Sequence, residues 1–506
     1  MRSDHRVLFV TPECAPLVKT GGLGDVAGSL PIALAKLSLD VRVLLPAYRG
    51  VLRAVQNAQT LARYPATSAF PECALLDGGS VEGVPLLLLD CPSLFDRDGG
   101  PYQDTADEDW PDNALRFGLL CRIAANLAQG NHGIQATGAG TGAALASWLP
   151  DIVHCNDWQT GLVPAYLKYG PPTQARTVFT VHNLAFQGIF PPDTVTQLGL
   201  PAESLAMDGV EYFGNMSFLK AGLQFADAIT TVSPTYAREI QGEALGMGMH
   251  GLLAERRGAL TGILNGIDTH AWNPRTDPRT PHHFGERTMS GKKRNKQALQ
   301  RRLGLAEDPS LPLLACVSRL THQKGIDLIP EIADELLAVP AQLAILGSGD
   351  HAMQASLEGL ARRFPGRAGI TLGFDEDLAH LIEAGADMFL MPSRFEPCGM
   401  NQMFSQRYGT VPIVHATGGL VDSVTDCTAE SLASHTATGF VFDPCTSDEL
   451  MRAIRRALDL FGQPRTWRAI QRSGMRRDFS WTASAARYAD IYRQVQVQII
   501  RPNSNR

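Results

Sequence analysis

Short apolar runs alternate with longer segments whose apolar residues recur at helical spacing, and the alternation continues through most of the chain. In the first half the predicted strands are residues 7–10, 41–45, 86–89, 152–154, 177–181 and 229–232. In the second half they are residues 313–317, 342–346, 370–372, 388–391, 413–414 and 439–442. Near-continuous apolar strands joined by helical segments are typical of parallel sheets covered on both faces.

The two series predict an α/β protein with two doubly wound, Rossmann-like domains. Ligands in such domains bind beyond the carboxyl ends of the strands, so we expect an active-site cleft between the domains. The first domain is expected to span residues 1–264 and the second residues 265–477. A last helical pattern within residues 478–506 is expected to pack back on the first domain.

The composition is that of a globular protein with enough apolar material for two cores. The chain has 506 residues, of which 44% are hydrophobic and 19% charged, and its formal net charge is -6. That charge argues against a nucleic-acid partner, which would require a clustered basic face. No apolar run is long enough to span a membrane. The nine cysteines form no C-x-x-C pair, which favours free thiols and a cytoplasmic location.

A glycine-rich turn follows the first predicted strand. Lys19 precedes Gly21, Gly22 and Gly24, Asp25 follows, and an apolar helical pattern comes next. Such a turn presents backbone N–H groups and the positive end of a helix dipole, so it suits phosphate. The alternative is a tight turn that requires glycine for its backbone angles. A nicotinamide enzyme is disfavoured because the second strand lacks the ribose-binding acid at its end.

Two loops of the second half carry further candidate chemistry. Arg319 follows one strand and Lys324 lies near the next helix, so the two cations can clamp a diphosphate. Glu396 lies in a loop that leads to a helix and can accept hydrogen bonds from sugar hydroxyls. The amides of residues 399–401 can bind the distal phosphate. The alternatives are solvated cations and an acid that interacts with a helix dipole.

His182 and Asp157 each follow a predicted strand of the first half, where a ligand is expected. Three D-x-D matches, at residues 96–98, 107–109 and 375–377, are interpreted as acidic surface loops rather than metal ligands. A cationic clamp makes a metal unnecessary, so we expect neither a metal nor a cofactor.

These residues belong to motifs that resemble bacterial glycogen synthases and the related plant starch synthases over nearly the whole chain. The matching motifs are K-T-G-G-L (residues 19–23), D-W-Q (157–159), H-N-L-A-F-Q-G (182–188), S-P-T-Y-A-R-E-I (233–240), L-N-G-I-D (264–268), S-R-L (318–320), Q-K-G (323–325), P-S-R-F-E-P-C-G (392–399), T-G-G-L (417–420) and F-S-W (479–481).

The resemblance implies a GT-B fold and transfer of glucose from ADP-glucose to the non-reducing end of an α-1,4-glucan, with retention of configuration. It implies no nucleic-acid or membrane partner. The residues that it assigns to catalysis are Glu396, His182, Arg319, Lys324 and Asp157. The residues that it assigns to donor binding are Lys19, Gly22, Asp25, Asn265, Phe374, Cys398, Gly399, Met400 and Asn401.

Four positions depart from patterns seen in related proteins. Asn156 and Gln159 stand where some members have histidine, and Asn401 replaces a threonine. We expect these polar exchanges to alter acceptor contacts. Related retaining families place a second glutamate at the position of Phe404. Without a clear nucleophile, the expected mechanism is a front-face displacement.

Three other functions remain alternatives. The first is another retaining GT-B glucosyltransferase that uses UDP-glucose or a small acceptor. The second is a glucan phosphorylase, which is longer and holds pyridoxal phosphate on a lysine. The third is a glucan-binding homologue without catalysis; it is disfavoured because the phosphate-binding cations and Glu396 are all present.

Overall fold

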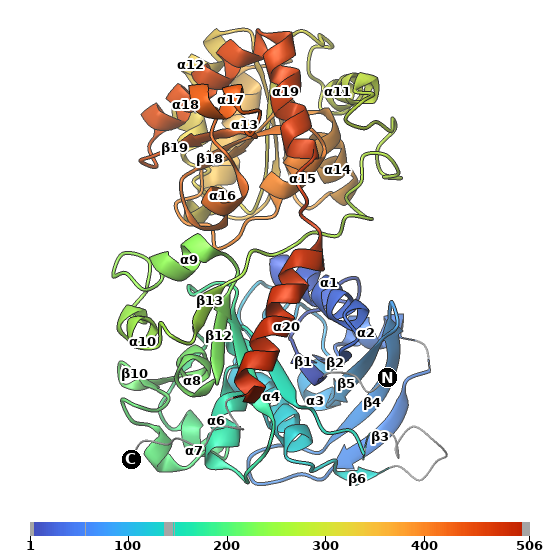
Figure 1. Ribbon diagram of the computed structural model, residues 1–506, viewed down its shortest axis with the longest axis vertical. Helices are drawn as coiled ribbons and strands as arrows, with labels where there is room; N and C mark the ends of the chain where they lie inside the picture. The colour runs from blue at the N-terminus through green and yellow to red at the C-terminus, as the bar shows by residue number, and fades with distance from the viewer. Residues whose placement is uncertain (1–4, 56, 136–144, 146, 498–506) are drawn as a thin grey trace. The chain divides into compact units, whose positions relative to one another are not determined.

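The computed structural model describes residues 5–55, 57–135, 145 and 147–497 and divides into two compact units. The first unit comprises the described residues of Met1–Val232, Ala237–Gly266 and Trp481–Arg506 (Figure 1). The second comprises Ser233–Tyr236 and Ile267–Ser480. The hydrophobic pattern gave no indication that the short piece Ser233–Tyr236 leaves the first unit. It is held in the second because Ser233 Oγ donates to the Pro397 carbonyl (2.7 Å).

The first unit is built on a sheet with the order β13-β12-β8-β7-β1-β2-β5-β4-β3-β6. Its strands are β1 (Arg6–Val10), β2 (Asp40–Pro46), β3 (Gln59–Tyr64), β4 (Cys73–Val81), β5 (Val84–Asp90), β6 (Ile134–Gln135), β7 (Ile152–Asn156), β8 (Arg176–Val181), β12 (Ala228–Thr231) and β13 (Leu260–Gly262). A small second sheet contains β9 (Ile189–Phe190), β10 (Glu211–Tyr212) and β11 (Asn215–Ser217).

The expectation of a wholly parallel sheet in this unit is wrong at one edge. Strands β13 to β5 pair in parallel, but β4 pairs with β5, and β3 with β4 and β6, in antiparallel fashion. The reason is local. Glu82 and Gly83 have φ values of 46° and 85° and form a two-residue turn, which can join only antiparallel neighbours.

The second unit contains a wholly parallel sheet with the order β16-β15-β14-β17-β18-β19. Its strands are β14 (Leu313–Val317), β15 (Gln342–Gly347), β16 (Ala368–Leu372), β17 (Met388–Met391), β18 (Val411–His415) and β19 (Phe440–Phe442). All six were predicted from the hydrophobic pattern. The strand order reverses between β14 and β17, and this reversal is where doubly wound sheets bind ligands.

The helices alternate with the strands. In the first unit they are α1 (Gly22–Lys36), α2 (Arg49–Ala54), α3 (Pro92–Phe95), α4 (Asn113–Ala128), α6 (Leu162–Tyr169), α7 (Thr194–Gln197), α8 (Phe218–Phe225), α10 (His250–Glu255) and α20 (Trp481–Val497). In the second they are α11 (Ser290–Arg302), α12 (Leu328–Ala338), α13 (His351–Arg363), α14 (Glu376–Gly385), α15 (Asn401–Arg407), α16 (Gly418–Ser423), α17 (Ala429–Ala433), α18 (Ser447–Phe461) and α19 (Pro464–Met475). Helix α9 (Pro234–Glu239) begins in the second unit and ends in the first.

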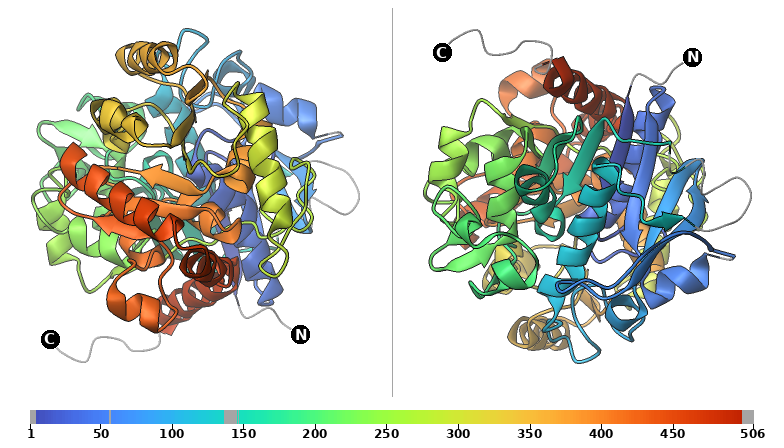
Figure 2. Two further views of the ribbon diagram at one scale, coloured as in Figure 1. Left: turned by 90° about the horizontal axis from the view of Figure 1, so that it is seen from above. Right: turned by 90° about the horizontal axis from the view of Figure 1, so that it is seen from below.

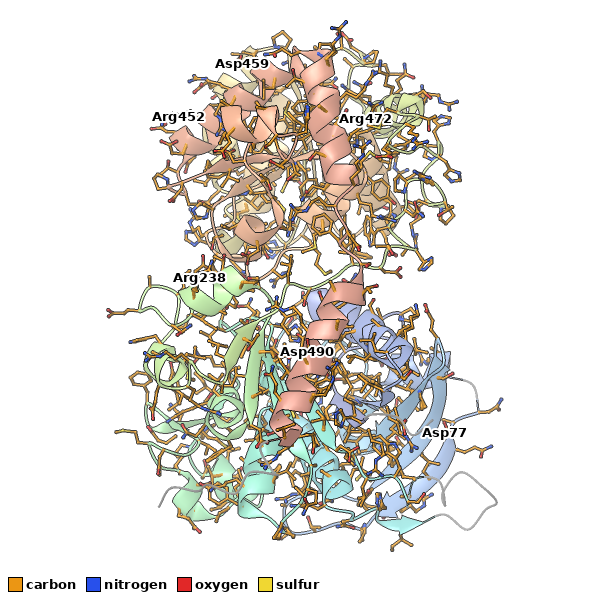
Figure 3. All side chains as sticks on the ribbon, in the orientation of Figure 1. Asp77, Arg238, Arg452, Asp459, Arg472 and Asp490 are labelled. Carbon is orange, nitrogen blue, oxygen red and sulfur yellow. The ribbon has the colours of Figure 1, made fainter. Side chains whose placement is uncertain are left out.

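The sheet of the second unit is covered on both faces, as its apolar strands predict. Leu314 of β14 belongs to a core cluster that includes side chains of α12 and α18, whereas its neighbour Leu313 belongs to a cluster with α11 and α14. Successive side chains of a strand point to opposite faces, which accounts for this division. Helix α18 keeps Arg452 and Asp459 at the surface (Figure 3).

The helix α20 returns the end of the described chain to the first unit (Figure 2). Its Tyr492 shares a 2.7 Å hydrogen bond with Nδ1 of the fully buried His154, whose Nε2 lies 2.6 Å from Thr180 Oγ1. Burial lowers the pKa of His154 to about 3, so this histidine is neutral. Residues 498–506 of the expected terminal segment lie outside the described residues. No helix among the described residues is long and apolar enough to cross a membrane.

The contact between α20 and the sheet yields a stability prediction. Tyr492→Phe removes one partner of a buried histidine, so the free energy of unfolding of the first unit should fall by about 1–3 kcal/mol. Denaturant titration followed by tryptophan fluorescence measures the change. Asp490→Ala, at an exposed position of the same helix, should change it by less than about 0.5 kcal/mol. Equal stability of Tyr492→Phe and the unmodified chain would contradict this role.

Candidate active site

The glycine-rich turn lies between β1 and α1, at the carboxyl edge of the first sheet. Gly21 precedes α1, and Lys19 is exposed beside it. Lys19 Nζ donates to Asp25 Oδ1 at 2.7 Å, with 46% and 29% of the two side chains exposed. This exposed ion pair contributes little to stability, so a phosphate can compete for the ammonium group at small cost.

A residue that sequence analysis missed, Glu13, holds this turn. Its buried carboxylate accepts hydrogen bonds from Thr20 N and Oγ1 (both 2.6 Å), from Gly21 N (3.3 Å) and from the Tyr102 hydroxyl (2.5 Å). Because Glu13 accepts the amides of Thr20 and Gly21, fewer backbone N–H groups are free than the glycine-rich motif predicted. The first amides of α1, at Gly22 and Leu23, remain for a ligand. The sequence feature that could have identified Glu13 is an acidic residue between a predicted buried strand and a glycine-rich turn.

Asp157 and His182 follow the neighbouring strands β7 and β8 and lie together. The Asp157 carboxylate accepts the backbone N–H of His182 at 3.3 Å. Asp157 is only 7% exposed, and burial raises its pKa to about 7. Its φ of 60° is unusual for a residue with a side chain. Strained backbone of this kind is concentrated at functional sites.

Asn265 follows the edge strand β13 at the same carboxyl edge of the sheet. The residue is 6% exposed, and its side-chain oxygen has no hydrogen-bond partner among the described residues. An unsatisfied buried oxygen costs about 1–3 kcal/mol. A donor group of a ligand would remove that cost.

In the second unit, Arg319, Lys324 and Glu396 lie at the reversal between β14 and β17. Lys324 Nζ donates to Glu396 Oε2 at 2.6 Å, and Ser393 Oγ donates to the same oxygen at 2.9 Å. Glu396 is 5% exposed. Arg319 is exposed, and its side chain forms no hydrogen bond or ion pair with any residue that the structure describes. Its guanidinium group is thus available to an anion.

Glycines let the loops of this site approach closely. Gly325 has a φ of +65°, and a Cβ there would lie 1.9 Å from the Pro392 carbonyl oxygen. Arg394 N donates to the Gln323 carbonyl across the same contact (2.9 Å). Gly418, with a φ of +45°, would place a Cβ 1.9 Å from the Glu396 carbonyl oxygen. The loops that carry Lys324 and Glu396 therefore meet only because these positions lack side chains.

The remaining donor-binding candidates surround this reversal. Asn401 begins α15 and donates from Nδ2 to the Val317 carbonyl at 2.7 Å. Gly399 has a φ of +66° and precedes it together with the half-buried Met400, while Cys398 is buried. Phe374, after β16, is 90% exposed. An aromatic ring held in water is available for stacking on a base.

Each unit thus gathers its own candidates at the carboxyl edge of its own sheet. In the first unit these are Lys19, Gly22, Asp25, Asp157, His182 and Asn265. In the second they are Arg319, Lys324, Phe374, Glu396, Cys398, Gly399, Met400 and Asn401.

The side chains of Asn156 and Gln159, which are expected to alter acceptor contacts, are both buried: Asn156 is 0% exposed and Gln159 is 4% exposed. Asn156 nevertheless contacts the His182 ring, with its Oδ1 3.1 Å from Nε2. Phe404 is also buried and stacks on Trp272, with ring centroids 3.9 Å apart.

Two of the D-x-D pairs are engaged by arginines. Arg49 pairs with both Asp96 and Asp98, at 2.7 and 2.6 Å. Asp375 pairs with Arg302 and Asp377 with Arg279. Within the described residues, no group of three or more His, Cys, Asp or Glu side chains is arranged to hold a metal ion.

Comparison with known proteins places this arrangement in a family. The starch synthase catalytic domain model matches residues 6–255, and the glycosyl transferases group 1 model matches residues 296–472. Glycogen synthases of Nitrosospira multiformis and Aromatoleum aromaticum are 54% and 56% identical over 490 and 487 residues, with 96% of each chain covered in both cases. The chain belongs to the glycogen synthase family.

The structure of this glycogen synthase family member also matches a solved relative. The catalytic domain of starch synthase IV from Arabidopsis thaliana, bound to ADP and acarbose, is 32% identical with a TM-score of 0.84. The match covers 97% of this chain and 99% of the other. The two Rossmann-like units have the GT-B fold, as the family resemblance predicted.

The contact at Gly325 can be tested against a glycine with the same backbone angle. Gly304 also has a φ of +65°, but a Cβ there would meet nothing within 4 Å. Gly304→Ala should cost only the backbone strain, about 1–2 kcal/mol. Gly325→Ala should cost clearly more, because a side chain pushes the two loops apart. Denaturant titration of both variants measures the difference, and equal costs would show that the loops do not need this contact.

Asp157 gives a pH dependence whose sign follows from its pKa. An aspartate in an unfolded chain titrates near pH 3.9. Because burial raises the folded pKa to about 7, the folded state binds more protons between these values. The contribution of Asp157 therefore becomes more destabilising as pH rises from about 4 to 7 and is constant above.

Asp157→Asn removes this contribution. Thermal unfolding of both proteins at several pH values between 5 and 8 should show the stability difference shifting in favour of the variant as pH rises. A difference that does not change with pH would contradict the raised pKa.

Proposed function

We propose that this protein is a retaining glucosyltransferase that moves glucose from ADP-glucose to the non-reducing end of an α-1,4-glucan. The observation that carries the proposal is the cationic site at the β14–β17 reversal. There an unpaired Arg319 accompanies Lys324 and a buried Glu396. Family membership supplies the reaction class, and the ADP bound to the Arabidopsis starch synthase supports the choice of donor.

The charges of the site suit a departing diphosphate. Lys324 is partly neutralised by Glu396, whereas Arg319 keeps its full charge. Charge that develops on the leaving phosphate would be stabilised by Arg319 and by a Lys324 that shifts from carboxylate to phosphate oxygen. In the first unit, Lys19 and the amides of Gly22 and Leu23 are the candidates for binding phosphate. A carboxylate at Glu396 can accept hydrogen bonds from glucose hydroxyls.

Retention is proposed to follow from a front-face displacement. Desolvation lowers the pKa of the half-buried His182 to about 3, so its ring is neutral at pH 7. A leaving phosphate oxygen would take the proton of the acceptor hydroxyl on the face from which it departs. All nine cysteines are free thiols, and this supports activity in the reducing cytoplasm.

The clamp is tested most cleanly at Arg319. Arg319→Ala should lower kcat by about 10²–10³-fold, since the lost interaction forms as charge develops in the transition state. Lys324→Ala is a less clean test because it leaves Glu396 buried without its cation. Arg362→Ala on α13, where 72% of the side chain is exposed, is the matched control and should leave kcat unchanged. An unchanged kcat in Arg319→Ala would remove the clamp from the mechanism.

The reaction itself is tested by donor turnover with glycogen as acceptor and with ADP-glucose or UDP-glucose in parallel. Glucose incorporation from ADP-glucose, in a linkage that an α-1,4-specific glucosidase cleaves, is the expected result. Turnover with UDP-glucose alone would overturn the donor assignment and leave the transferase proposal standing. No incorporation from either donor would contradict the proposed function.

A further inference from the structure

Asn156 occupies the last position of β7 and connects the first strand of the sheet to His182. Its Nδ2 donates to the Val10 carbonyl at 3.0 Å and to the His154 carbonyl at 3.4 Å. Its Oδ1 lies 3.1 Å from Nε2 of His182. The side chain is 0% exposed, so no water competes for these contacts.

The surrounding carbonyls fix the orientation of this amide. Only the NH₂ group can face Val10 O and His154 O, because two oxygens in contact would repel each other. The amide oxygen must then face His182, and an oxygen without a proton can only accept. The proton of the neutral imidazole consequently resides on Nε2, and Nδ1 carries a lone pair.

Nδ1 of His182 forms no hydrogen bond within the described part of the chain, and the residue is only half-buried. We propose that Asn156 is a positioning residue that locks His182 in its Nε2–H tautomer, so that Nδ1 accepts a hydrogen bond from a sugar hydroxyl of the substrate. The assignment of a sugar to His182 rests on the proposed function. The assignment of the Nε2–H tautomer is independent of the proposed function.

An amide suits this task better than a carboxylate would. A carboxylate beside Nε2 would favour the imidazolium form, in which both nitrogens donate. The titratable groups that face His182 are Asp157, whose carboxylate accepts the His182 backbone N–H, and His154, which is neutral. Neither contacts the ring nitrogens, so Asn156 alone among the described side chains determines which nitrogen holds the proton.

Asn156→Leu removes the oxygen that accepts from Nε2–H and keeps a side chain of similar volume. Without that acceptor the ring is no longer held in place, and part of the His182 population should carry its proton on Nδ1, which then cannot accept from a sugar hydroxyl. The variant should therefore lower kcat by about several-fold or more, while KM for the donor changes little.

The same variant loses the hydrogen bonds to the Val10 and His154 carbonyls, so the protonation of the ring nitrogens, rather than activity alone, separates positioning from packing. A lowered kcat in Asn156→Leu with unchanged His182 nitrogen signals would show that Asn156 serves only the packing of β7, and it would overturn the proposal.

A measurement without turnover tests the tautomer directly. With ¹⁵N-labelled histidine, the His182 signals, assigned by their disappearance in His182→Gln, should show a protonated Nε2 and an unprotonated Nδ1 at pH 7. In Asn156→Leu the two nitrogens should move toward the average of both tautomers. A proton on Nδ1 in the unmodified protein would overturn the proposal even if glucose transfer is observed. The predicted signals without any transfer would instead contradict only the proposed function.

Discussion

The second unit depends on how closely its loops approach at the end of β14 and β17. The parallel sheet brings both strand ends to one edge, and the loops that follow these strands carry Lys324 and Glu396. Gly325 lets the two loops approach closely, because the Pro392 carbonyl oxygen occupies the space where a side chain would lie. Lys324 can then reach Glu396, and desolvation of that pair is offset by their short contact and by Ser393.

The first unit holds its loops together with neutral groups and with the buried carboxylate of Glu13. Glu13 accepts hydrogen bonds from the glycine turn and from Tyr102. Asn156 connects β1 to His182. The result is a preorganised edge. Among the described residues it offers a ligand the first amides of α1, Nδ1 of His182, the oxygen of Asn265 and the Lys19 ammonium, which is held only by an exposed ion pair. Preorganised polar groups of this kind do not need to reorganise during a reaction.

The hydrophobic pattern predicted all six strands of the second sheet and the parallel strands of the first sheet except the short edge strand β13, because burial on both faces demands continuous apolar runs. It failed at β3 and β4, where the antiparallel edge follows from the turn at Glu82 and Gly83 rather than from strand composition. The sequence motifs identified the candidate site residues but did not predict which residues form hydrogen bonds with them. The burial of Asn156 and the use of the Gly21 amide by Glu13 depend on contacts between distant segments, which spacing in sequence does not reveal.

The return of α20 to the first unit has a consequence for the order of events during synthesis. A ribosome releases the sheet of the first unit early, and N-terminal domains commonly fold before the rest of the chain appears. Here, however, the hydrogen bonds of His154 with Tyr492 and of the Leu264 carbonyl with Ser484 cannot form until α20 has been synthesised. The second unit, whose segments end at Ser480, is fully synthesised before those partners emerge. The first unit is therefore completed after the second, and a nascent chain carries an uncovered face there until α20 has been synthesised.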